Sequence, residues 1–229
     1  LRAARTGART PAAVAGLAIG LAFFARPYTA VLFATPFIFH ALWTLRSLEW
    51  GPAVRQATTV ALGLAGVAVT LGYNAYVTGS PTTFPYQAFA PLDGPGFGYR
   101  RILDYDRVYS GPLAIEANAR ILGRYVTNWT PAAPLGTLAA AVGLDVTFRR
   151  LPAVDPRKAV LAGLAVSVPF GQLFFWGTLN SLGELDRVGD GLVYFMGPYY
   201  HTGLLVPTTV LGAAGLLWLR ARLRSWAVT

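Results

Sequence analysis

The amino-acid sequence predicts an all-α integral membrane protein with about six transmembrane or membrane-embedded helices. Hydrophobic residues make up 54% of its 229 residues and charged residues only 13%, about half the charged share of an ordinary soluble domain. The mean hydropathy is positive, at +0.46. The apolar residues fall into long blocks between charged segments, which is the pattern of bilayer spans and differs from the short alternation of a soluble core.

Six apolar blocks account for the predicted helices, and two of them are short. A bilayer core of about 30 Å needs roughly 20 helical residues. The first and fourth blocks, with 15 and 14 residues, fall furthest below that length, so we expect them to be tilted, to cross a locally thinned membrane or to insert only partly. The six blocks are residues 11–25, 27–45, 57–73, 131–144, 159–176 and 203–219.

The basic residues predict the orientation of these helices. If every block crosses, twelve Lys and Arg residues lie on the side of both termini and seven lie on the other side. An excess of basic residues marks the cytoplasmic side, so we expect a multi-pass protein of the cell membrane with both termini in the cytoplasm. The single membrane domain, residues 1–229, would then carry two extracytoplasmic loop regions, residues 74–130 and 177–202.

The longer of these outer regions combines irregular chain with one amphipathic helix. Proline and glycine interrupt every regular pattern between Pro91 and Gly98. In residues 112–127, by contrast, the apolar residues share one helical face and charged residues occupy another, which predicts a helix lying along the membrane surface. The apolar face consists of Ile115, Ala119, Leu122 and Val126.

Arg26 is the first candidate for a binding role, because it stands between two apolar blocks with only Pro27 to help turn the chain. Its guanidinium is therefore expected at the outer membrane boundary, where it could hold a phosphate with two parallel hydrogen bonds. The alternative role is that of an interfacial anchor that snorkels to lipid headgroups.

Carboxylates in the two outer regions are the candidates for a general base. Clustered acids in polar loops are more often simply solvated, and their spacing here matches no EF-hand loop and no histidine-based metal site. Cys is absent, so a thiolate metal site is excluded, and no cofactor is expected, although a need for a divalent metal stays open. The acids are Asp93, Asp104 and Asp106 in the longer region and Glu184, Asp186 and Asp190 in the shorter one.

Two histidines lie in or beside the apolar blocks, His40 in the second block and His201 at the start of the last. Either side chain could titrate near neutrality. A lone histidine among helices more often makes a hydrogen bond within the packing, and the tyrosines before His201 fit an interfacial aromatic belt. The net charge of +9 does not indicate a nucleic-acid partner, because the basic residues stand at the ends of apolar blocks.

Three stretches of the sequence carry a shared family pattern. The first, from Gly16 to Ala30, is an apolar helix that ends in a basic residue, a proline and small residues. The second, from Gly72 to Pro81, combines Asn with aromatic residues and Gly-Ser-Pro, and the third is a Gly-Pro-aromatic approach to a late helix, residues 196–200. In this order they resemble the polytopic glycosyltransferases of the GT-C superfold, the group related to protein O-mannosyltransferases and aminoarabinose transferases.

The resemblance implies transfer of a sugar from a polyprenyl- or dolichyl-phosphate donor to an acceptor on the extracytoplasmic side. It places the donor phosphate at Arg26, with Arg120, Arg124 and His201 as weaker candidates. The family's basic residue between the Gly-Pro and the aromatic pair is missing here, and its catalytic acid belongs to a first external loop upstream of Leu1. We therefore expect a C-terminal part of such an enzyme that is inactive alone, with a lipid-linked sugar donor and membrane lipids as its partners.

Two other classes of protein stay open. A transporter or flippase for lipid-linked sugars would need polar residues along a path through the membrane, whereas the apolar blocks are almost free of charge. A noncatalytic membrane subunit fits the composition equally well.

Overall fold

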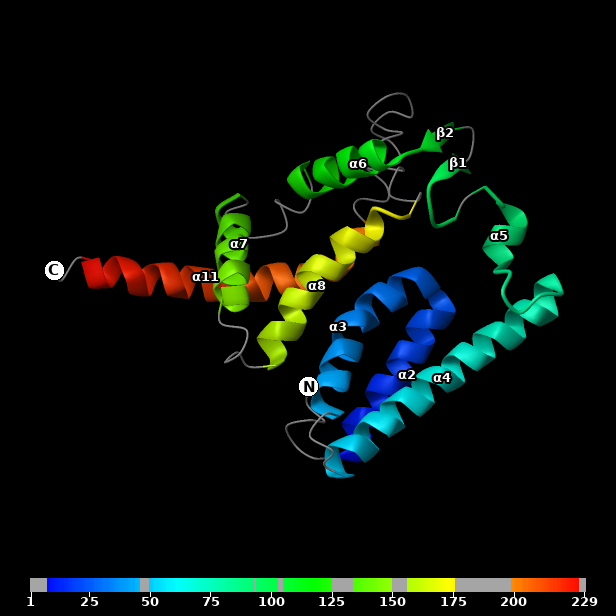
Figure 1. The fold of residues 1–229 in the computed structure, drawn as a ribbon, viewed down its shortest axis with the longest axis horizontal. Coiled ribbons are helices and arrows are strands. Elements are labelled where there is room, and N and C mark those ends of the chain that lie inside the picture. Colours follow the sequence, from blue (N-terminus) through cyan, green and yellow to red (C-terminus); the bar gives the residue numbers. More distant parts are fainter. Residues whose placement is uncertain are drawn as a thin grey trace. The chain divides into compact units, whose positions relative to one another are not determined.

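The computed structural model describes residues 8–45, 50–92, 94–102, 105–124, 134–149, 156–175 and 199–226. The chain divides into two compact units, Leu1–Pro91 and Leu92–Thr229, and each unit is described by itself. Helices dominate both units, which confirms the predicted helical class (Figure 1). Every one of the six apolar blocks lies at least largely within a helix.

Among its described residues, the first unit contains three long helices and one short one. The first two match the predicted blocks closely, because Arg26 alone separates them. The third is longer than the predicted block 57–73 at both ends, and its 29 residues span about 44 Å. The helices are α2 (Arg9–Ala25), α3 (Pro27–Leu45), α4 (Trp50–Thr78) and α5 (Pro85–Phe89).

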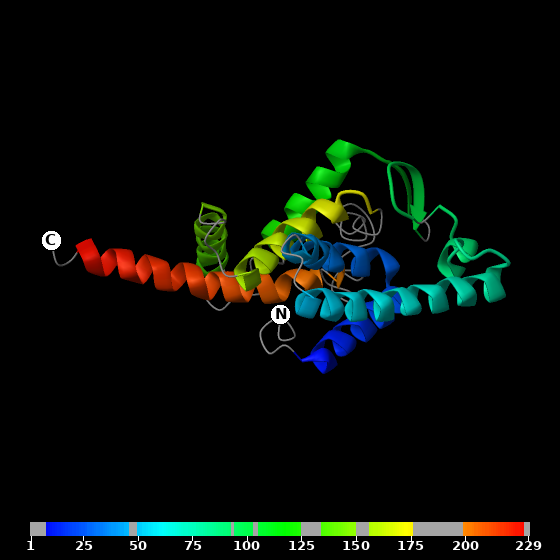
Figure 2. The ribbon, with the colours of Figure 1, turned by 60° about the horizontal axis from the view of Figure 1, so that its bottom comes forward.

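Helices α2 and α4 lie side by side with their backbones in close contact (Figures 1 and 2). A Cβ atom added to Gly16 would lie 2.5 Å from the backbone oxygen of Thr59, and one added to Gly20 would lie 3.0 Å from the Cα of Gly66. The hydroxyl of Thr59 also donates a hydrogen bond to the carbonyl of Ala12 across the pair, at 3.0 Å. Small residues thus hold this pair together, as they do between helices in membranes.

The contacts along this pair also give its direction. Gly16 meets Thr59, Gly20 meets Gly66, and the Phe24 ring lies 5.5 Å from the Tyr73 ring. Later residues of α2 contact later residues of α4, so the two helices are parallel. The C-terminal ends of α2 and α4 therefore lie at the same end of this unit.

The second unit contains a β-hairpin and four α-helices among its described residues. The hairpin is antiparallel, with Gly98 opposite Tyr109, and was not predicted from the sequence. Its strands are β1 (Gly98–Ile102) and β2 (Tyr105–Tyr109). The helical elements are α6 (Gly111–Arg124), α7 (Pro134–Arg149), α8 (Pro156–Gln172), the 3-10 helix η4 (Tyr199–Leu204) and α11 (Leu205–Trp226).

Helix α7 crosses α11 at a steep angle, again through small residues (Figure 1). A Cβ atom on Gly143 of α7 would meet the carbonyl of Leu211, and one on Gly215 of α11 would meet the carbonyl of Ala139. Because α7 has only 16 residues, it spans about 24 Å, less than a bilayer core.

Helix α6 matches the predicted amphipathic segment 112–127, but its buried face differs from the apolar face read from the sequence. Ile115 is 61% exposed, whereas Ile121 packs with Val168 of α8 and Leu204 of η4. The buried residues of α6 are Ala114, Ala117, Asn118 and Ile121. One polar side chain, Asn118, thus lies within the buried face.

Two helical segments of the described part are long and apolar enough to cross a membrane, namely α4 and residues Tyr200–Ser225. Helix α2 is apolar but shorter. Large apolar side chains point away from the packed core, including Leu21 on α2 at 70% exposed and Phe39 on α3 at 68%. Exposed apolar surface of this kind marks a membrane or protein contact.

Candidate functional site

Arg26 occupies the junction of α2 and α3 and belongs to the hydrogen bonding of both helices. Its backbone N–H donates to Ala22 at 2.7 Å and closes α2, while its carbonyl accepts from the N–H of Ala30 at 2.9 Å and opens α3. The side chain is partly buried. The ends of two helices therefore fix the backbone from which the Arg26 side chain extends.

A polar turn lies at the same end of the unit, where α4 ends. The side chain of Asn74 is buried and donates from Nδ2 to the carbonyl of Pro81 at 3.1 Å. The hydroxyl of Thr78 lies within 3.0 Å of three carbonyls and accepts the N–H of Ser80. Gly79 has φ +77°, which favours glycine. Asn74, Thr78 and Gly79 therefore have a structural role, which is to close the turn.

The second unit contains a buried polar contact between the two predicted outer regions. His201 of η4 is 0% exposed, and its Nε2 lies 2.8 Å from Oδ1 of Asn118 on α6. Because Oδ1 of Asn118 is an acceptor, Nε2 of His201 carries the proton and donates it to this oxygen. The contact joins residues 83 positions apart, so it fixes η4 against α6.

Further polar groups surround this contact and tie the end of α8 to the same place. The buried Gln172 donates from Nε2 to the carbonyl of Tyr200 at 3.2 Å, one residue before His201. The Tyr109 hydroxyl donates to the carbonyl of Leu173 at 2.9 Å. Residues from β2, α6, α8 and η4 thus meet in one buried polar cluster.

Two buried atoms of this cluster, Nδ1 of His201 and Nδ2 of Asn118, have no hydrogen-bond partner among the described residues. Buried polar atoms are usually paired, and an unpaired one costs about 1–3 kcal/mol. In the tautomer described above, Nδ1 is an acceptor and Nδ2 a donor. The cluster can therefore bind one further donor and one further acceptor.

The remaining predicted site residues are not brought together with Arg26 or His201 by any described contact. Arg120 pairs with Glu116 at 2.6 Å, and both side chains are 49% exposed. Arg124 ends α6, and Asp106 lies opposite Arg101 in the hairpin register, but their side chains lie outside the described ones. Asp93, Asp104, Glu184, Asp186 and Asp190 lie outside the described residues. No cluster of three or more His, Asp or Glu that could hold a metal occurs within the described ranges.

No protein-family model, no curated protein and no solved structure matches this chain.

Asn118, Gln172 and Tyr109 were not identified from the sequence. Asn118 falls within the predicted amphipathic helix, and a polar residue one turn after the apolar Ala114 was the available signal. Gln172 and Tyr109 gave no comparable signal, because their partners are backbone carbonyls distant in the sequence.

Proposed function

We propose that this chain is an integral membrane protein and forms the donor-binding part of a glycosyltransferase that uses a lipid-phosphate-linked sugar. The membrane location is supported by two long apolar helical segments, by backbone contact through small residues and by exposed apolar side chains. The steep crossing and short length of α7 fit a partly inserted helix better than a full span.

The observation that carries the donor-binding proposal is the position of Arg26. It stands at the junction of two apolar helices, at the same end of the unit as the polar turn after α4. In the proposed orientation this end faces outward, where the phosphate of a polyprenyl or dolichyl donor would lie. A cation stabilises the phosphate as it leaves, and Arg26 would supply that charge.

The His201–Asn118 contact supports the proposal in a second way. It joins the two regions proposed to lie outside the membrane, so one outer surface is built from both. His201 is buried and Arg120 is paired with Glu116, so we place the donor phosphate at Arg26, which stands at the junction of two apolar helices. The acceptor-activating carboxylate is proposed to come from another part of the enzyme.

The binding of undecaprenyl phosphate to the purified chain in detergent tests this role without requiring catalysis. Arg26→Ala should weaken binding roughly 10- to 100-fold, because charge-assisted hydrogen bonds contribute about 1.5–3 kcal/mol. The affinity of the Arg26→Lys chain should lie between those of the unaltered chain and Arg26→Ala, because lysine keeps the charge and loses the paired hydrogen bonds.

Arg55→Ala is the matched control, because Arg55 is also partly buried but lies near the opposite end, at the start of α4. The Arg55→Ala chain should bind undecaprenyl phosphate as tightly as the unaltered chain. Unchanged binding in Arg26→Ala would show that Arg26 is an interfacial anchor and not a phosphate ligand.

A further inference from the structure

The last turns of α11 carry three exposed arginines, Arg220, Arg222 and Arg224. None of them makes a salt bridge within the part of the chain that the structure describes. The sequence contains no acidic residue after Asp190, so α11 itself offers no counter-charge. Only Arg222 has a described side-chain contact, which is a cation–π contact at 5.6 Å over the Trp218 ring.

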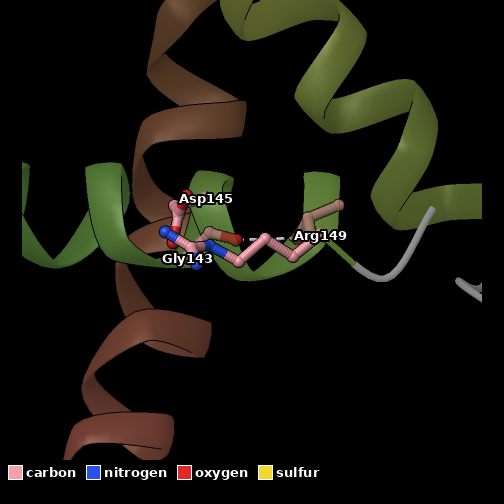
Figure 3. Close-up of polar contacts among 4 residues, drawn as sticks. Gly143, Asp145 and Arg149 are labelled. Carbon is pink, nitrogen blue, oxygen red and sulfur yellow. Dashed lines mark hydrogen bonds and ion pairs between the residues drawn. The ribbon is translucent and has the colours of Figure 1, made fainter.

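Other arginines of the same unit are neutralised by a neighbour. Arg149 on α7 pairs with Asp145 one turn earlier at 2.8 Å, as Figure 3 shows where α7 crosses α11. Arg120 pairs with Glu116 in the same i, i+4 way. The arginines of α11 differ from these two in having no carboxylate partner among the described residues.

Two of the three arginines border an open groove of about 510 Å³ along one face of α11. Spacings of three, four, seven and eight residues place its lining on a single helix face. The lining residues are Leu216, Leu219, Arg220, Leu223 and Arg224, and we call this surface the α11 groove. Its lining is apolar, because the three leucines and the aliphatic parts of Arg220 and Arg224 form it, and both arginines are exposed.

We propose that the α11 groove binds an anionic phospholipid. Arg220 and Arg224 would bind the headgroup phosphate, and the acyl chain would lie along the three leucines. An amphiphile with negative charge at one end complements both the apolar lining and the charge of the two exposed arginines, whereas a soluble phosphate leaves the leucines bare. Trp218 and Arg222 beside the groove are residue types typical of a membrane interface. The inference rests on the proposed membrane location but not on the transferase activity.

Fluorescence quenching in vesicles tests this proposal. The chain has no native Cys, so Ala221→Cys on exposed α11 gives a single labelling site for a bimane fluorophore beside the groove. The labelled chain is inserted into phosphatidylcholine vesicles with brominated phosphatidylglycerol or brominated phosphatidylcholine as the quencher. The anionic lipid should bind more tightly, and each lost arginine should lower that preference up to about fivefold.

The variant pair Arg220→Gln with Arg224→Gln should abolish the preference, and high salt should weaken it. Arg149→Gln is the matched control, because it removes an arginine that already has a partner, and it should leave the preference unchanged. Equal quenching by the two lipids in the labelled but otherwise unaltered chain would overturn the proposal, whatever the variants do.

Three further results would also count against it. A preference that survives the double variant, or that Arg149→Gln reduces equally, would show a general surface charge effect. Displacement of the anionic lipid by millimolar inorganic phosphate would show a soluble-anion site. A chain that does not insert into vesicles would overturn the membrane proposal itself, whereas insertion without lipid preference would overturn only this inference.

Discussion

Replacing Gly16 by Ala should destabilise the first unit, because α2 and α4 touch backbone to backbone at that position. The new Cβ would lie 2.5 Å from the Thr59 oxygen and 2.8 Å from the Leu62 Cβ, whereas ordinary contact begins near 3.4 Å. The helices would therefore have to part by about 0.9 Å, and overpacking of this kind costs about 1–3 kcal/mol. The higher helix propensity of alanine returns about 1 kcal/mol, so the expected net loss is up to about 2 kcal/mol.

Gly72→Ala is the matched control on α4, since a Cβ there meets nothing within 4 Å. It keeps the gain in helix propensity and has no clash, so its stability should equal or exceed that of the unaltered chain by up to about 1 kcal/mol. The assay is unfolding of the purified chain in mixed micelles with increasing denaturing detergent, followed by far-ultraviolet circular dichroism. If Gly16→Ala and Gly72→Ala change stability equally, the α2–α4 backbone contact does not exist.

Two other predictions concern orientation and the buried cluster. Ala119→Cys on the exposed face of α6 should react with an impermeant thiol reagent added to intact cells and Lys158→Cys should not, and the reverse result would invert the proposed topology. Asn118→Ala should cost about 1–3 kcal/mol in the same unfolding assay, because it leaves the buried Nε2 of His201 unpaired. Glu116→Gln on the same helix removes only an exposed ion pair, so a loss as large as that of Asn118→Ala would refute the assignment.

The sequence was sufficient to predict the helices, because blocks of apolar residues leave few alternatives to a helix. The ends were predicted less well. Helix α4 begins at Trp50, seven residues before the predicted block, because polar residues such as Arg55 and Gln56 continue the helix beyond its apolar part. Charge and hydropathy locate the apolar segment of a helix and not its hydrogen-bonded ends.

The β-hairpin was missed because its strands are polar and short. Tyr99 and Tyr109 were read as parts of a loop, although two residues alone separate the strands, a spacing typical of hairpins.

The candidate site residues also differ in how far the sequence predicts them. Arg26 is visible in the sequence because a charge between apolar blocks is rare, whereas the partnership of Asn118 with His201 depends on tertiary packing that no local pattern encodes.

The end of α8 forms hydrogen bonds with residues that come much earlier in the sequence. Carbonyls at a helix end lack partners within the helix. Just after α8, the Tyr109 hydroxyl donates a hydrogen bond to the carbonyl of Leu173, and the N–H of Gly96 donates to the carbonyl of Phe174 at 2.6 Å. The Tyr109 contact joins residues 64 positions apart. A deletion of the hairpin would therefore remove the Tyr109 donor from the carbonyl of Leu173, so the turn that follows α8 should fray.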